Sequence, residues 1–244
     1  MLLAAAFLPR PRLPGAPLLR PAWAWAYPVV LGLAGVLIYM NAGVVRADIY
    51  YKQAWDGYHK RAFDGLMSRA MDRATAQRYY DAALYYYDRA LRYAPSEDYY
   101  MLFYGKAFLE RAEFTEDARL QAQYLARGEQ VLQRAASVNP LNTDHTANLA
   151  RLYRTWAGVA ADAATRQDKL AQSDRYYAAA TRLSPHNAAL YNEWGRTLLD
   201  LGQREQALAK YQQSLALDDR FGQTYLLLGD YYLGLQDFEQ ARCY

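Results

Sequence analysis

Three basic residues occupy equivalent places along the chain, each directly after a small residue in an apolar stripe: Lys106, Arg151 and Arg196. At helical spacing, a side chain in this place points away from the packed stripe. The three residues therefore predict a basic ladder along one surface. Such cations suit an acidic peptide, a C-terminal carboxylate, or an anionic glycan or lipid head group.

Three further residues extend this candidate partner-binding site. Arg154 follows Arg151 by three residues, which places both on one helical face. Asn148 and Asn192 are candidates for hydrogen bonding to the backbone of an extended ligand. The alternative is that these residues form an ordinary solvated helix face, which is the commoner role of charged residues on helices.

The sequence has none of the patterns that mark a nucleotide or catalytic site. A phosphate loop, a dinucleotide-binding glycine pattern, an H-E-x-x-H pair and a C-x-x-C pair are all absent from it. His59, His145 and His186 are far apart, and the last two each follow a proline closely, in a predicted turn. Cys243 is the only cysteine. We therefore expect no catalytic residue, no cofactor and no metal site, and this chain is predicted not to be an enzyme.

The elements that would position the ladder are short helices in a repeating order. Pro95, Pro140 and Pro185 are 45 residues apart, and an apolar stripe at helical spacing lies on each side of each proline. The stripes after the prolines contain Gly105, Ala150 and Gly195 as small residues, and Gly229 follows Gly195 by 34 residues. The stripe after Pro185 and its partner read Tyr191, Trp194, Gly195 and Leu198, then Ala207, Tyr211 and Ser214.

This pattern resembles the tetratricopeptide repeat (TPR), which has a usual period of 34 residues. The resemblance implies an all-α fold, a TPR-type α-solenoid of antiparallel helix pairs whose first helices line the concave face. The two 45-residue steps are expected to hold extra residues between their helices, near 111–120 and 157–168. Residues predicted to be mostly buried are Trp194, Tyr211, Leu149, Tyr177, Tyr104 and Leu132.

The N-terminal part of the chain differs in composition from the repeats. Residues 1–21 form a basic, proline-rich segment, and 22–45 contain no charged residue. A helix of roughly 20 apolar residues spans a bilayer, so 22–45 predict a transmembrane helix with Trp23, Trp25 and Tyr27 at one interface. The alternatives are a buried soluble helix and a signal peptide. Residues 46–244 then form the TPR array, about four repeats plus an incomplete fifth.

The charge distribution favours one membrane orientation. Arg10, Arg12 and Arg20 are the only charged residues before position 46, which favours a cytoplasmic N-terminus and an extracytoplasmic TPR domain. The predicted location is the cytoplasmic membrane, crossed once by this chain. The net charge of +3 comes from those arginines, because the array itself is neutral. A neutral array lacks the basic footprint of nucleic-acid-binding proteins.

Two stretches extend the resemblance beyond the repeat: NPLNTDHTANLARLYRTWA at 139–157 and the run VRADIYYKQAWDGY after the apolar segment. They resemble the C-terminal region of bacterial O-antigen ligase or polymerase-type membrane proteins, over about residues 22–220. The resemblance implies a role in lipid-linked glycan assembly at the cell envelope. The catalytic part of that family lies in a multi-span domain that this sequence lacks, so no family catalytic residue is placed here.

Two classes of function therefore remain open. The chain is either a membrane-anchored protein-interaction scaffold, independent of glycans, or the non-catalytic C-terminal part of a glycan ligase. The partner at the concave face would be a protein or peptide, acidic if it pairs with the basic ladder, or an anionic glycan. Because the last apolar stripe stops at Tyr244, the chain is expected to be a fragment.

Overall fold

The computed structural model describes residues 26–244, and helix is the only regular secondary structure in that range. The all-α prediction is confirmed for these residues. The helices are α1 (Ala26–Lys52), the π-helix η2 (Gln53–His59), α2 (Lys60–Met67), α3 (Arg73–Tyr93), α4 (Asp98–Glu113), α5 (Ala118–Val138), α6 (Thr143–Gly158), α7 (Ala163–Leu183), α8 (Ala188–Asp200), α9 (Arg204–Leu217), α10 (Gly222–Gly234) and α11 (Phe238–Ala241).

The chain divides into two compact units, Met1–Ala42 and Gly43–Tyr244. In the first unit the structure describes only the beginning of α1, whose apolar side chains, among them Leu31, Leu37 and Ile38, are exposed. The helical stretch Ala26–Met67 is long and apolar enough to cross a membrane, a test that N-terminal signal sequences also pass. The predicted basic segment, with Arg10, Arg12 and Arg20, and the interfacial Trp23 and Trp25 lie outside the described residues.

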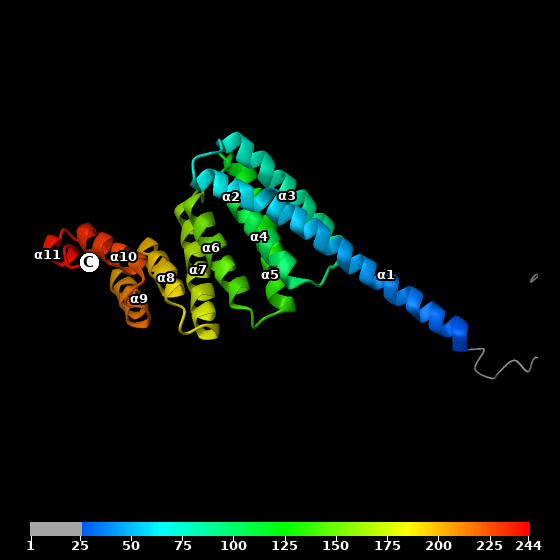
Figure 1. The fold of residues 1–244 in the computed structure, drawn as a ribbon. Coiled ribbons are helices and arrows are strands. Elements are labelled where there is room, and N and C mark those ends of the chain that lie inside the picture. The colour runs from blue at the N-terminus through cyan, green and yellow to red at the C-terminus, as the bar shows by residue number, and fades with distance from the viewer. Residues whose placement is uncertain (1–25) are drawn as a thin grey trace, which may run out of the picture. The chain divides into compact units, whose positions relative to one another are not determined.

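In the second unit, helices consecutive in sequence pack as antiparallel hairpins. Figure 1 shows α4 against α5, α6 against α7 and α8 against α9, each pair followed by the next. Neither helix of such a pair can bury its apolar stripe alone, so each pair is stabilised by its neighbours. The first helices α4, α6 and α8 are those that contain the candidate site residues.

The 45-residue repeats are longer chiefly because their helices are longer. In the 34-residue repeat α8 and α9 have 13 and 14 residues, whereas α4 and α6 have 16 and α5 and α7 have 21. The extra residues lie on both sides of the turn, near the predicted ranges 111–120 and 157–168, but mostly as additional helical turns. This differs from an inserted loop, since added turns extend the apolar seam between the two helices.

Most of the residues predicted to be buried are buried. Tyr211, Tyr177, Leu149 and Leu132 are at most 1% exposed, whereas Tyr104 and Trp194 are only half-buried. The partial exposure of Trp194 is explained by its polar and cationic partners. Its indole Nε1 donates to Asp174 Oδ1 at 2.7 Å, and the Lys210 ammonium lies 3.8 Å from the ring centroid. Both partners keep one edge of the indole at the surface.

Aspartates begin the three long second helices at 45-residue intervals. Asp72, Asp117 and Asp162 are the N-cap residues of α3, α5 and α7, and each accepts hydrogen bonds from backbone N–H groups of the first turn. The first turn of a helix has N–H groups without intrahelical partners, and an N-cap carboxylate satisfies them. The repeating cap therefore fixes where each of these helices starts.

Asp117→Ala is expected to lower the free energy of unfolding by about 1 kcal/mol, because the N–H groups of Arg119 and Leu120 lose their acceptor. Urea unfolding of the full chain in detergent micelles, followed by circular dichroism, measures the change. The exposed neighbour Glu116 supplies the matched control, since Glu116→Ala leaves the cap in place. Equal midpoints for the two variants would contradict a stabilising cap at Asp117.

Candidate partner-binding groove

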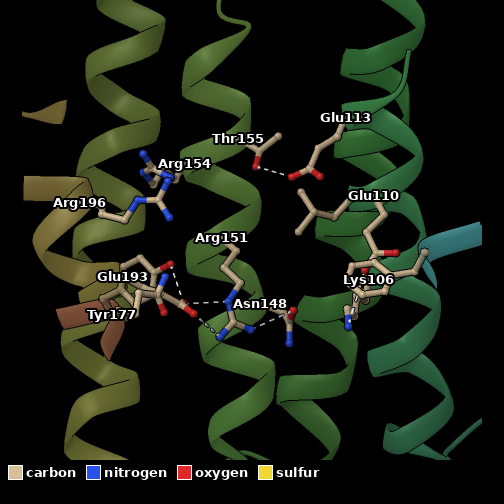
Figure 2. Close-up of a pocket in the computed structure, with 13 residues that line it drawn as sticks. Lys106, Glu110, Glu113, Asn148, Arg151, Arg154, Thr155, Tyr177, Glu193 and Arg196 are labelled. Atoms are coloured by element: carbon tan, nitrogen blue, oxygen red, sulfur yellow. Dashed lines mark hydrogen bonds and ion pairs between the residues drawn. The ribbon is translucent and has the colours of Figure 1, made fainter. Parts of the chain in front are cut away.

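A solvent-open cavity of ≈ 380 Å³ lies on the first helices of three successive repeats. Figure 2 shows its charged and polar lining, with α4 residues on one side, α6 residues in the middle and α8 residues on the other side. Phe63 of α2, Tyr177 of α7 and Gln223 of α10 complete the lining. We refer to this cavity as the groove. Its size lies within the range of roughly 300–1,000 Å³ that is usual for ligand pockets.

Five of the six residues proposed from the sequence line this groove: Lys106, Asn148, Arg151, Arg154 and Arg196. The sixth, Asn192, lies elsewhere. Its side chain is 1% exposed, and its amide Nδ2 donates to Thr224 Oγ1 of α10 at 2.9 Å. Asn192 therefore joins α8 to the following repeat and does not face a ligand in the groove.

The basic residues of the groove are largely neutralised by carboxylates. Arg151 donates two hydrogen bonds to Glu193, from Nε at 2.8 Å and from Nη2 at 2.9 Å. The Nε of Arg154 donates to Asp200 Oδ2 at 2.7 Å. Lys106 Nζ lies 3.6 Å from Glu110 Oε1. The surface is therefore a mixed one, not the uniformly basic ladder that the sequence suggested.

Three acids line the groove that were not among the residues proposed from the sequence: Glu110, Glu113 and Glu193. Helical spacing could have identified them. Glu110 and Glu113 follow Lys106 by four and seven residues, and Glu193 precedes Arg196 by three, so each shares a helical face with a proposed residue. The candidates taken from the sequence were basic and amide residues, so the acids on the same helical faces were left out.

A buried polar network lies behind the α4 side of the groove. His59 is 1% exposed, with Nδ1 2.9 Å from the Tyr87 hydroxyl and Nε2 2.8 Å from Glu110 Oε2. Tyr80 donates its hydroxyl to the same Glu110 oxygen at 2.9 Å. His59 is the last residue of η2, and π-helical segments of this kind are rare and often occur at functional sites.

Glu110 is held in its ionised form by these neighbours. Burial alone would raise the pKa of its carboxyl group, but the hydrogen bond and charge of His59, the charge of Lys106 and the hydrogen bond from Tyr80 outweigh burial and lower it. Glu113 behaves oppositely. Desolvation at the groove wall and the nearby Glu110 charge raise the pKa of the Glu113 carboxyl group. Its hydrogen bond from Thr155 Oγ1 is long, at 3.4 Å.

The second buried histidine joins two repeats. His145 was interpreted from the sequence as an ordinary turn residue, but it is the third residue of α6 and is fully buried. Its Nε2 lies 2.7 Å from Asp98 Oδ2, at the start of α4, and Asn139 Nδ2 donates to the same oxygen at 3.1 Å. Within residues 26–244, no group of three or more His, Cys, Asp or Glu side chains is arranged to hold a metal ion.

Comparison with known proteins finds similarity at the level of structure. No family model matches the chain, and no curated protein matches its sequence. A solved structure that does match is TTC0263, described as a thermophilic TPR protein in Thermus thermophilus. It has a TM-score of 0.54 and 22% identity, over 69% of this chain and 81% of that one. The fold is of the tetratricopeptide-repeat type. At this identity the likeness shows the fold alone.

MamA proteins are also among the similar structures. The MamA 41-end structure from Desulfovibrio magneticus RS-1 has a TM-score of 0.49 and 15% identity, over 81% of this chain and 89% of that one.

Proposed function

We propose that residues 46–244 are a protein-interaction scaffold whose groove binds an extended segment of a partner protein. The observation that supports this most directly is the convergence of five separately proposed residues on one open cavity. That cavity is built by the first helices of three stacked repeats. TPR-type scaffolds present extended concave surfaces of this kind to their ligands. The proposal assigns no catalytic role to the chain.

Site-specific photo-crosslinking in native membranes tests this function. A photoreactive amino acid replaces Gln223, an exposed lining residue of the groove, or, as a control, Gln212 on the exposed face of α9. We expect a discrete protein adduct from position 223 only, and we expect Arg196→Glu to reduce its yield. Identical adducts from both positions, or no protein adduct from position 223, would rule out the groove as a protein-binding site.

We propose further that the apolar part of α1 anchors the scaffold in the cytoplasmic membrane, with 46–244 on the extracytoplasmic side. The exposed apolar side chains of Ala26–Ala42 and the absence of charge from 22–45 support the anchor. A reporter enzyme that is active only outside the cytoplasm, fused after Tyr244, is expected to be active. Replacing Arg10, Arg12 and Arg20 by alanine is expected to weaken that orientation. Activity only of a cytoplasmic reporter would reverse the topology.

We also propose a more specific role in glycan assembly, in which this scaffold is the C-terminal part of an O-antigen ligase or polymerase-like protein. Its support is the resemblance at 139–157 and in the run after Val45. The alternative is an independent membrane-tethered adaptor. Deleting the coding region separates the two. An altered profile of envelope glycans supports the ligase link, and an unchanged profile supports the adaptor.

A further inference from the structure

Two of the charged residues that line the groove make no ion pair with any residue in the described range 26–244. They are Glu113, the last residue of α4, and Arg196 of α8. Every other charged lining residue has a partner of opposite sign: Lys106 with Glu110, Arg151 with Glu193, and Arg154 with Asp200. The internal pairs therefore cancel, and one negative and one positive charge remain available.

The two remaining charges lie on different walls of the groove. Figure 2 shows Glu113 beside Glu110 on the α4 side, and Arg196 beside Arg154 on the α8 side. Arg196 is exposed, and Glu113 is exposed at the rim with one long hydrogen bond. A charge at a partly desolvated surface is stabilised by a ligand group of opposite sign, so each residue selects one such group.

We propose that the groove recognises an extended peptide segment with one basic and one acidic side chain in a fixed order along its backbone. The basic side chain lies against Glu113 and the acidic one against Arg196. This inference rests on the proposed scaffold function and adds the charge pattern of the partner. Because the two receptor charges differ in sign and come from different repeats, they define a direction for the bound chain.

The same arrangement disfavours the other ligands that were considered from the sequence. A uniformly acidic peptide, an anionic glycan or a lipid head group would meet Arg196 favourably but would place negative charge against Glu113 and Glu110. Like charges brought together at an interface lower affinity for the wrong partner. Opposite charges on the two walls therefore select against purely anionic ligands.

Selection from a phage library of random nine-residue peptides tests the inference on the full chain in detergent micelles. We expect the enriched peptides to share one basic and one acidic residue in a constant order and spacing. A synthetic enriched peptide is then measured by fluorescence anisotropy. Glu113→Gln and Arg196→Gln are each expected to weaken its binding about fivefold, the upper range for a solvent-accessible ion pair. Arg204→Gln and Glu205→Gln, on the exposed start of α9, serve as charge-matched controls.

The double charge exchange Glu113→Arg with Arg196→Glu gives the decisive comparison. It keeps the net charge of the groove and is expected to enrich peptides with the acidic and basic residues in the opposite order. Enrichment of the same order from both proteins, of purely acidic peptides from the parent, or of no charge pattern at all would overturn the inference. The photo-crosslink at position 223 is a separate measurement, so a protein adduct from it without a charge order in the selected peptides would leave the scaffold function standing.

Discussion

Glu110→Ala is expected to lower the free energy of unfolding by about 2–6 kcal/mol, because two buried hydrogen-bonding side chains lose their acceptor. The carboxylate accepts from His59 at 2.8 Å and from the Tyr80 hydroxyl at 2.9 Å. His59 is buried, and the Tyr80 side chain has no exposed surface, so the groups left behind find no water. Unsatisfied buried polar groups cost about 1–3 kcal/mol each, which is consistent with this range.

Chemical unfolding of the full chain in detergent micelles measures this effect, with circular dichroism and tyrosine fluorescence recorded together. Glu113→Ala is the matched control, because Glu113 lies one turn further along α4 and makes only the long bond from Thr155. We expect the control to stay within about 0.5 kcal/mol of the parent, as for most surface substitutions. A Glu110→Ala midpoint equal to that of the control would show that the buried network contributes no net stability.

The same residue predicts a pH dependence with a defined sign. The folded-state pKa of Glu110 is lowered, so in acid the unfolded state binds more protons and stability rises with pH. The contribution is fully present above the ordinary glutamate pKa of 4.5 and is lost as the pH falls through the lower folded-state value. Glu110→Gln is expected to reduce the stability loss below pH 4.5 without abolishing it. Asp98 still contributes: burial would raise the pKa of its carboxyl group, but hydrogen bonds from His145 and its neighbours lower it. If Glu110→Gln lost as much stability below pH 4.5 as the parent, Glu110 would not be a source of the acid sensitivity.

The sequence was sufficient to predict which helices pair and most of the side chains that they bury, although Tyr104 and Trp194 are only half-buried. The apolar stripes have a helical period, and residues such as Tyr177 and Tyr211 belong to one stripe whatever the neighbouring repeat contains. The same reasoning placed Lys106, Arg151 and Arg196 on one surface, because an equivalent position in each repeat faces the same way. Periodicity carries this information without any knowledge of side-chain contacts.

Pairing between side chains could not be predicted in the same way. Arg151 meets Glu193 and Arg154 meets Asp200 across neighbouring repeats, at separations of 42 and 46 residues. Such contacts depend on how far one repeat is rotated against the next, which the stripe pattern does not specify. The burial of His59 and His145 has the same origin, since the partners Glu110 and Asp98 come from another repeat. The stripe pattern therefore brought most of the proposed residues to one cavity but did not show that carboxylates pair with three of the basic ones.

The close approach of α8 and α9 at Gly195 predicts a second large change in stability. Gly195 is the small residue in the apolar stripe of α8, and a Cβ atom built there would be 2.4 Å from Cε1 and 2.8 Å from Cδ1 of Tyr211. The Tyr211 side chain has no exposed surface, so the ring has little room to move. Gly105 meets Leu132 in the same way between α4 and α5, with a Cβ to Cγ distance of 2.4 Å. Both repeats thus use a small residue to bring the helices into contact.

Gly195→Leu is expected to destabilise the array by about 1–3 kcal/mol through overpacking. The sign of the stability change is informative, because replacing a glycine by leucine within a helix would otherwise stabilise the helix by about 1 kcal/mol. Gly158→Leu provides the control, since that exposed glycine ends α6 with no atom within 4 Å of a built Cβ. Thermal unfolding of both variants in detergent micelles compares them directly. If the Gly195→Leu midpoint were equal to or above that of Gly158→Leu, α8 and α9 would not be in close contact at this glycine.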